Sequence, residues 1–151
     1  MRDRTEADDK VQGAANRALL ELVLPSARVA AKHVGYAITV HGSLNRDIDL
    51  VAIPWREGAT DADKLVAAIC GAIGGVTGSC HPHNEWGDKP HGRKAKTLLV
   101  YCGENHMQID LSIMPTICQR NTMLRALILQ TFATPHHYWR RSLPRQRLNT
   151  L

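Results

Sequence analysis

The sequence predicts an α+β fold in which a mixed or antiparallel β-sheet is flanked by helices. Two patterns predict it: apolar residues recur at helical spacing in three segments, and four short runs are rich in β-forming residues. Neighbouring β-runs are close enough in the chain to pair as hairpins, and helical segments separate these pairs. The 151 residues, 44% hydrophobic and 22% charged, fit one globular domain with an aliphatic core.

The first third of the chain predicts one helix followed by two strands. Residues 14–33 repeat apolar side chains at helical spacing, and Pro25 within them is expected to kink or divide the helix. Gly35 is a natural helix end, and it precedes a short β-rich run at 36–41. Residues 47–53 form the second predicted strand, which a proline ends.

The middle of the chain predicts a second helix and a second pair of strands. Two aspartates begin a capped amphipathic helix over residues 61–73. A glycine- and histidine-rich loop is expected over residues 74–92. Two strands follow at 96–102 and 107–114, and the Gly-Glu-Asn segment at 103–105 predicts a tight hairpin between them.

The C-terminal quarter of the chain differs from the rest in charge. A last helix is predicted around residues 123–128, within a single domain that spans residues 1–134. Residues 1–115 carry 13 Lys or Arg and 14 Asp or Glu, whereas residues 116–151 carry six Arg and no acidic residue. We therefore expect residues 135–151 to be a basic extension, which either binds a polyanionic partner or is simply solvated.

No pattern in the sequence indicates secretion or membrane insertion. Residues 1–10 are almost wholly polar, and the longest uncharged stretch, residues 65–84, is interrupted by glycine and proline. None of the four cysteines is part of a C-x-x-C pair, so they are most simply reduced thiols in the core. Cys80, His81 and His83 lack the ligand spacing of common zinc modules. We expect a cytoplasmic protein with no membrane partner.

Three aspartates in apolar strands give the strongest indication of function. Asp47 and Asp49 alternate with Ile48 and Leu50, so both carboxylates project from one face of their strand. Asp110 lies likewise between apolar residues of the last predicted strand. Carboxylates on one face repel one another unless a cation compensates, and Mg²⁺ (or Mn²⁺) prefers such oxygen ligands. If the two strands are neighbours, three carboxylates converge on a two-metal site; the alternative is a solvated strand edge.

Two further features suit a substrate that carries phosphate. Gly42-Ser43 directly follows a strand, where a glycine lets backbone N–H groups approach a phosphate and the serine adds a hydroxyl. The basic side chains of Lys89, Arg93 and Arg46 are candidates to grip the phosphates. Each feature also has a simpler explanation. Gly42-Ser43 could be an ordinary turn, and Lys89 and Arg93 could lie in a solvated loop. Arg46 could be the counter-ion of the neighbouring Asp47.

The segments H-G-S…D-I-D-L-V-A-I and Q-I-D-L-S-I resemble the DNA polymerase β-like nucleotidyltransferase superfamily, especially its minimal phage-type and antitoxin-like members. The resemblance covers residues 36–114 and implies the minimal nucleotidyltransferase fold. It also implies roles for five residues: phosphate binding by Gly42 and Ser43, metal binding by Asp47 and Asp49, and a third carboxylate, Asp110, that binds metal and helps to activate the attacking hydroxyl. This chain departs from the family's pattern in having only Leu44, Asn45 and Arg46 between Gly-Ser and the acid pair.

The resemblance implies a metal-dependent nucleotidyltransferase whose substrates are an NTP, such as ATP, and a hydroxyl acceptor in an RNA, a protein or a small molecule. The acceptor would attack the α-phosphorus, and pyrophosphate would leave. The alternative is a non-catalytic module of the same fold that binds a partner protein or nucleic acid. A homo-oligomer is compatible with either function. A third hypothesis is a basic protein that binds nucleic acid through its C-terminal segment.

Overall fold

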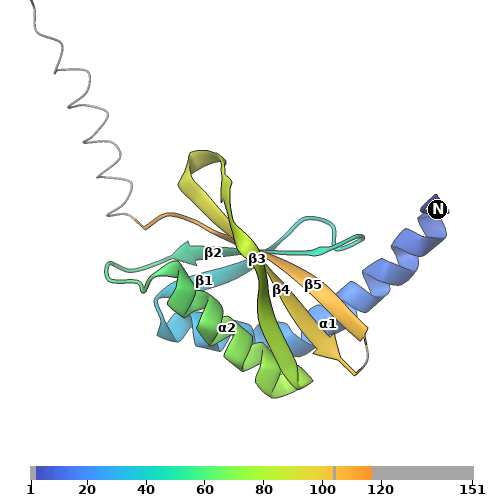
Figure 1. Ribbon diagram of the computed structural model, residues 1–151, viewed down its shortest axis with the longest axis horizontal. Coiled ribbons are helices and arrows are strands. Elements are labelled where there is room, and N and C mark those ends of the chain that lie inside the picture. Colours follow the sequence, from blue (N-terminus) through green and yellow to red (C-terminus); the bar gives the residue numbers. More distant parts are fainter. Residues whose placement is uncertain (1–2, 104, 117–151) are drawn as a thin grey trace, which may run out of the picture.

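The computed structural model describes residues 3–103 and 105–116, and it confirms an α+β fold in which helices flank a mixed sheet (Figure 1). The elements in chain order are α1 (Glu6–His33), β1 (Tyr36–His41), β2 (Ile48–Pro54), α2 (Ala62–Thr77), β3 (Ser79–Lys89), the 3₁₀ turn η1 (Pro90–Gly92), β4 (Arg93–Cys102) and β5 (Asn105–Ile113). Of the helices described, none is long and apolar enough to cross a membrane.

The five strands lie in the order β1-β2-β5-β4-β3. As expected, β1 pairs with β2 and β4 with β5 as antiparallel hairpins. The strands β2 and β5 join the two hairpins and run parallel to each other, which makes the sheet mixed. Parallel neighbours need a long crossover connection, and α2 with the β3–β4 hairpin provides it. The motif-bearing strands β2 and β5 are therefore adjacent in the sheet.

Both helices cover one face of the sheet, and the other face is open. Figure 1 shows α1 and α2 on the same side, with the turn between β3 and β4 rising away from them. Alternate residues of β2 and β5 point into the core beneath the helices: Ile48, Leu50, Ala52, Ile109, Leu111 and Ile113. The helices contribute Leu19, Leu20, Val23, Ala27, Ala31, Leu65, Val66, Ile69, Cys70 and Ile73. The residues that alternate with the core positions of the sheet lie on its open face.

The helix α1 begins earlier than its apolar pattern predicts. Thr5 caps its N-terminus: the Asp8 N–H donates to Thr5 Oγ1 at 3.3 Å, and the Thr5 N–H donates to Asp8 Oδ2 at 2.8 Å. This reciprocal pair satisfies two backbone donors and allows a polar first turn to be helical. Pro25 does not divide the helix, contrary to expectation; it lies inside the continuous α1 on the exposed side. Proline has no N–H to donate to the carbonyl one turn earlier in the helix. On the exposed side of α1, water can hydrate this carbonyl instead.

The prediction of a loop over residues 74–92 is wrong. This segment forms the end of α2, the edge strand β3 and the η1 turn. Glycine, proline and histidine conceal this strand in the sequence. An edge strand tolerates Pro82, and the register shift between His83 and Gly87 absorbs an irregularity. Trp86 attaches the strand to α2, since its Nε1 donates to Asp63 Oδ1 at 3.0 Å.

Some expectations lie outside the described residues. These are the helix around residues 123–128, the domain boundary after residue 134, the basic extension, and the fourth cysteine at 118. The other three cysteines are free thiols, of which Cys70 and Cys80 are buried as expected. Cys102 is exposed at the end of β4, so the expectation that every thiol lies in the core is wrong for this residue.

Burial on one face of β2 makes a direct prediction about stability. Leu50 is 1% exposed on the core face, whereas Ile53 of the same strand is 42% exposed on the open face. Leu50→Ala is expected to lower the free energy of unfolding by about 2–5 kcal/mol, because it leaves a cavity in the core. The matched variant Ile53→Ala should cost no more than about 1 kcal/mol in urea unfolding. Equal losses would contradict the one-sided core.

Candidate metal centre

Three aspartates converge on the open face of the sheet. Asp49 in β2 is the register partner of Asp110 in β5, and Asp47 immediately precedes β2. One carboxylate oxygen from each lies within 4.8 Å of the others. Among the described residues, this is the group of acids, histidines or cysteines whose geometry could hold a metal ion. The structure thus brings together the three acids that the sequence singled out.

The parallel pairing of β2 and β5 explains this convergence. Paired residues on neighbouring strands project from the same face, so Ile48, Leu50, Ile109 and Leu111 enter the core while Asp49 and Asp110 project from the open face. Thr97 of β4 is the register partner of Asp110 and donates its hydroxyl to Asp110 Oδ1 at 2.7 Å. This bond orients the third carboxylate and leaves its other oxygen for a ligand.

The three carboxylates are mutually unfavourable without a cation. Partial burial raises the pKa of Asp49 above its usual value of 3.8, and the charges of Asp47 and Asp110 raise it further. The charges of His41 and Lys89 act in the opposite direction. A divalent cation would replace this repulsion with attraction, and three carboxylates form the hard oxygen set that Mg²⁺ or Mn²⁺ prefers. The donor set therefore fits the ion that the sequence motif implies.

Gly42 leaves room beside the carboxylate of Asp49. Its φ is +81°, and a Cβ on this residue would lie 3.0 Å from Asp49 Oδ2. Any other residue would be strained and would crowd this oxygen. The next residue, Ser43, accepts a hydrogen bond from the Asn45 N–H at 3.3 Å, so in this structure its hydroxyl supports the turn. Phosphate binding by Gly42 and Ser43 stays a prediction.

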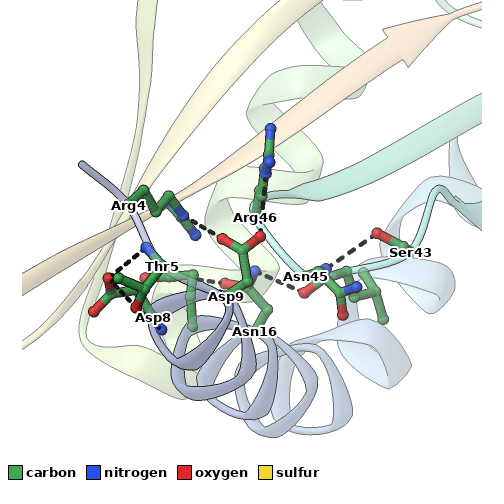
Figure 2. Close-up of polar contacts among 10 residues, drawn as sticks. Arg4, Thr5, Asp8, Asp9, Asn16, Ser43, Asn45 and Arg46 are labelled. Carbon is green, nitrogen blue, oxygen red and sulfur yellow. Dashed lines mark hydrogen bonds and ion pairs between the residues drawn. The ribbon is translucent and has the colours of Figure 1, made fainter.

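The short loop over residues 42–47 is attached to α1 (Figure 2). Asn16, only 2% exposed, donates from Nδ2 to the Leu44 carbonyl at 2.9 Å. Arg17 Nη2 donates to Asn45 Oδ1 at 3.1 Å from the same side of the loop. These bonds hold the loop between β1 and β2 in place, including Leu44, whose backbone is left-handed (φ +63°). The loop is too short to contain a helical turn, so its conformation depends on these contacts with α1. Sequence reasoning missed Asn16, whose only signal is a polar residue at a core position of an amphipathic helix.

Arg46 forms an ion pair with Asp9 of α1. The structure therefore does not support the alternative in which Arg46 is the counter-ion of Asp47, and phosphate binding by Arg46 stays a prediction. The Arg46 Nε lies 3.5 Å from Asp9 Oδ2, and Arg4 contacts the other oxygen of this carboxylate (Figure 2). Hydrogen bonding from Arg4, together with the charges of both arginines, lowers the pKa of Asp9 despite an opposing effect of desolvation. Both arginines line an open polar pocket with Asp47 and Gln108, directly beside the aspartate cluster.

The two other predicted phosphate ligands flank the η1 turn. Lys89 ends β3, and its charge reaches the cluster, because it lowers the pKa of Asp49. Arg93 begins β4 and donates from Nε to the Pro90 carbonyl at 3.3 Å, which engages it in the turn itself. The structure therefore places Lys89 within electrostatic range of the aspartates and Arg93 in a supporting position. Their binding to a nucleotide stays a prediction.

Asp49→Asn is expected to stabilise the metal-free protein at pH 7. Because folding raises the pKa of Asp49, the folded protein retains a proton that the unfolded chain has already lost just above pH 3.8. Ionised Asp49 therefore costs stability at neutral pH, and the gain from the substitution should shrink as the pH falls through its raised pKa. Thermal unfolding in a metal chelator, followed from pH 7 to pH 4, measures this difference.

When the chelator is replaced by millimolar Mg²⁺, the melting temperature of the wild type should rise and that of Asp49→Asn should not. Glu57→Gln is the control, since this exposed acid lies beyond the other end of β2 and should leave both measurements unchanged. A variant that melts below the wild type in chelator, or that still responds to Mg²⁺, would contradict this view of the cluster.

The attachment of the loop predicts a cost for removing Asn16. Asn16→Ala leaves the Leu44 carbonyl without its donor, so the free energy of unfolding should fall by about 1–3 kcal/mol in urea. Arg17→Ala removes the neighbouring exposed hydrogen bond and should change it by no more than about 0.5 kcal/mol. Equal effects of the two substitutions would show that the buried amide has no special part in holding the loop.

Comparisons with known proteins give little beyond the geometry. No protein-family model matches the sequence, and no curated protein matches it. Among solved structures, the chain is similar to one in the structure of the GLD-2/RNP-8 complex, with 14% sequence identity and a TM-score of 0.41. The match covers 84% of this chain and 48% of that chain, so this chain spans about half of its length. A similarity this distant assigns neither a family nor an activity.

Proposed function

We propose that this protein is a metal-dependent nucleotidyltransferase, which moves a nucleoside monophosphate from an NTP to a hydroxyl acceptor. The observation that carries the proposal is the trio Asp47, Asp49 and Asp110, whose carboxylate oxygens lie within 4.8 Å of one another on an open face. The Gly-Ser turn beside Asp49 and the sequence resemblance of these segments to minimal nucleotidyltransferases support the same reaction.

In this proposal the three aspartates hold Mg²⁺ or Mn²⁺. The bound ions would neutralise charge on the triphosphate and favour ionisation of the acceptor hydroxyl. Asp110, oriented by Thr97, faces the acceptor and helps to remove the proton of its hydroxyl. The acceptor oxygen then bonds to the α-phosphorus while the bond to pyrophosphate breaks. Catalysis rests on positioning and on electrostatic stabilisation.

The surroundings of the cluster supply positive charge for the phosphates. Lys89 acts on the electrostatics of Asp49, and Arg46 lines the polar pocket beside Asp47. The absence of a side chain at Gly42 allows a phosphate oxygen to approach the backbone next to Asp49. We assign these three residues to the NTP, with Ser43 and Arg93 in supporting positions.

A non-catalytic module that binds a partner protein or nucleic acid is the second candidate. The short loop favours it, because the Ser43 hydroxyl is engaged by the Asn45 N–H and the loop is fixed on α1. Such a module would keep the fold and the acid cluster without transferring a nucleotide. The two candidates differ in one measurable property, which is the appearance of pyrophosphate and labelled acceptor.

The test incubates the full-length protein and Mg²⁺ with each α-labelled NTP and a panel of RNA, protein and small-molecule acceptors. We expect transfer of label to one class of acceptor, at a rate that Asp49→Asn and Asp110→Asn each lower at least about 100-fold. Glu57→Gln should retain the wild-type rate. Label transfer that survives both aspartate substitutions would contradict the proposed site. Mn²⁺ binding without any transfer to the panel or pyrophosphate release would favour the non-catalytic module.

A further inference from the structure

The outer edge of β1 carries backbone groups that pair with no strand of the described chain. β1 pairs with β2 on one side only and stands first in the strand order of the sheet. The Trp55 N–H donates to the Gly35 carbonyl at 3.1 Å, and this bond directs every second residue from Gly35 onward toward β2. The alternate residues direct their N–H and C=O groups outward: Tyr36, Ile38 and Val40. Arg28 of α1 agrees with this direction, since its Nε donates to the Ile38 carbonyl at 3.4 Å.

An apolar pocket of about 350 Å³ lies along this edge. Its lining comes from β1, from α1 and from the residue after β2: Tyr36, Ala37, Ile38, Arg28, Lys32 and Trp55. The indole of Trp55 is 53% exposed, so much of its apolar surface is open to a partner. A chain that paired with β1 would lie about 4.8 Å from it, which places its side chains in this pocket.

The charged groups around the pocket are cationic. Arg28 and Lys32 line it, Arg56 lies beside it, and its described lining contains no acidic residue. Backbone carbonyls hold both guanidinium groups in place: Arg28 donates to Ile38, and Arg56 Nη2 donates to the His33 carbonyl at 3.2 Å. Each arginine keeps further N–H donors for a carboxylate. Charge complementarity therefore requires an acidic occupant.

This charge disfavours both occupants that the chain itself could supply. A second copy paired through its own β1 edge would bring another Arg28 and Lys32 against the first pair. The segment at 116–151 carries six Arg and no acid, so it would be repelled as well. A nucleic acid would contact the cations and Trp55, but it would leave the outward backbone groups of β1 without partners. An extended peptide uses the cations, the pocket and the backbone groups together.

The two sides of the edge determine which residues such a peptide carries. Trp55 continues the open-face positions of β2, two residues after the exposed Ile53, whereas Arg28 and Lys32 belong to α1 on the helix side of the sheet. Successive side chains of an added strand point to opposite faces. Side chains on one face therefore meet the indole, and those on the other face meet the cations of α1.

We propose that the outer edge of β1 binds an extended segment of a partner protein in which acidic and apolar residues alternate. The segment adds a strand to the sheet, with its apolar side chains against Trp55 and its carboxylates against Arg28 and Lys32. This surface is distinct from the aspartate cluster, since Asp49 lies near the beginning of β2 and Trp55 follows its end. The inference does not depend on the proposed function.

A synthetic peptide tests the surface on the full-length protein. The probe is fluorescein-labelled, alternates glutamate and valine, and has the six-residue length of β1. We expect saturable binding in fluorescence anisotropy, with a dissociation constant below about 1 mM. Lys32→Glu and Trp55→Ala should each raise this constant at least about fivefold. Lys10→Glu is the matched control, because it makes the same charge change at an exposed position near the other end of α1 and should leave the constant unchanged.

Amide NMR tests whether the peptide pairs with the backbone of β1. When the peptide is added, the amides of Tyr36, Ile38 and Val40 should shift and exchange more slowly with solvent. The amides of Ala37 and Thr39 already face β2, so their exchange should change little. A peptide with lysine in place of glutamate should bind at least about tenfold more weakly.

Circular dichroism confirms that each variant is folded. The proposal would be overturned by the absence of saturable binding, by equal affinity for the lysine peptide, or by affinity that neither Lys32→Glu nor Trp55→Ala lowers. Binding without protection of the outward amides would also overturn it. Single-stranded poly(U) that displaces the peptide and binds more tightly would assign the surface to nucleic acid instead.

Discussion

The parallel pairing of β2 with β5 is the constraint on which the candidate site depends. It sets Asp49 beside Asp110, and it does so because Ile48, Leu50, Ile109 and Leu111 are buried on the other face. A slip of one residue in β5 would move Asp110 into the core and Leu111 onto the open face. Burying the Asp110 carboxylate would cost more free energy than any contact between the aspartates could offset. This cost therefore fixes the register of β5 against β2. The core thus determines where the acids meet.

The residues around the cluster carry local costs that the rest of the fold offsets. Three carboxylates repel one another, Leu44 has a left-handed backbone, and Gly42 is required by both its φ and its contact with Asp49. The buried Asn16 holds this loop from α1, and Thr97 holds Asp110 from β4. Such concentration of unfavourable features at one place is typical of a functional site, where stability is lost in exchange for ligand binding.

The sequence predicts the two hairpins and all three aspartates, because strand alternation identifies which side chains share a face without any knowledge of packing. It does not reveal β3, whose proline, asparagine, glycine and aspartate are depleted in strands and are better tolerated in this edge position. It also starts α1 too late, since the first turns depend on the Thr5 cap and not on apolar spacing. The pairing of Arg46 with Asp9 joins residues far apart in sequence, and only the folded chain shows it.

The proposed reaction requires that Asp47, Asp49 and Asp110 together hold divalent cations. Anomalous diffraction from crystals of the full-length protein grown with Mn²⁺ and a non-hydrolysable NTP tests it most directly. We expect at least one manganese peak between the three carboxylates, with the triphosphate against it and Gly42 beside the bound phosphates. Manganese bound elsewhere, or an ordered nucleotide with no metal between these carboxylates, would contradict it.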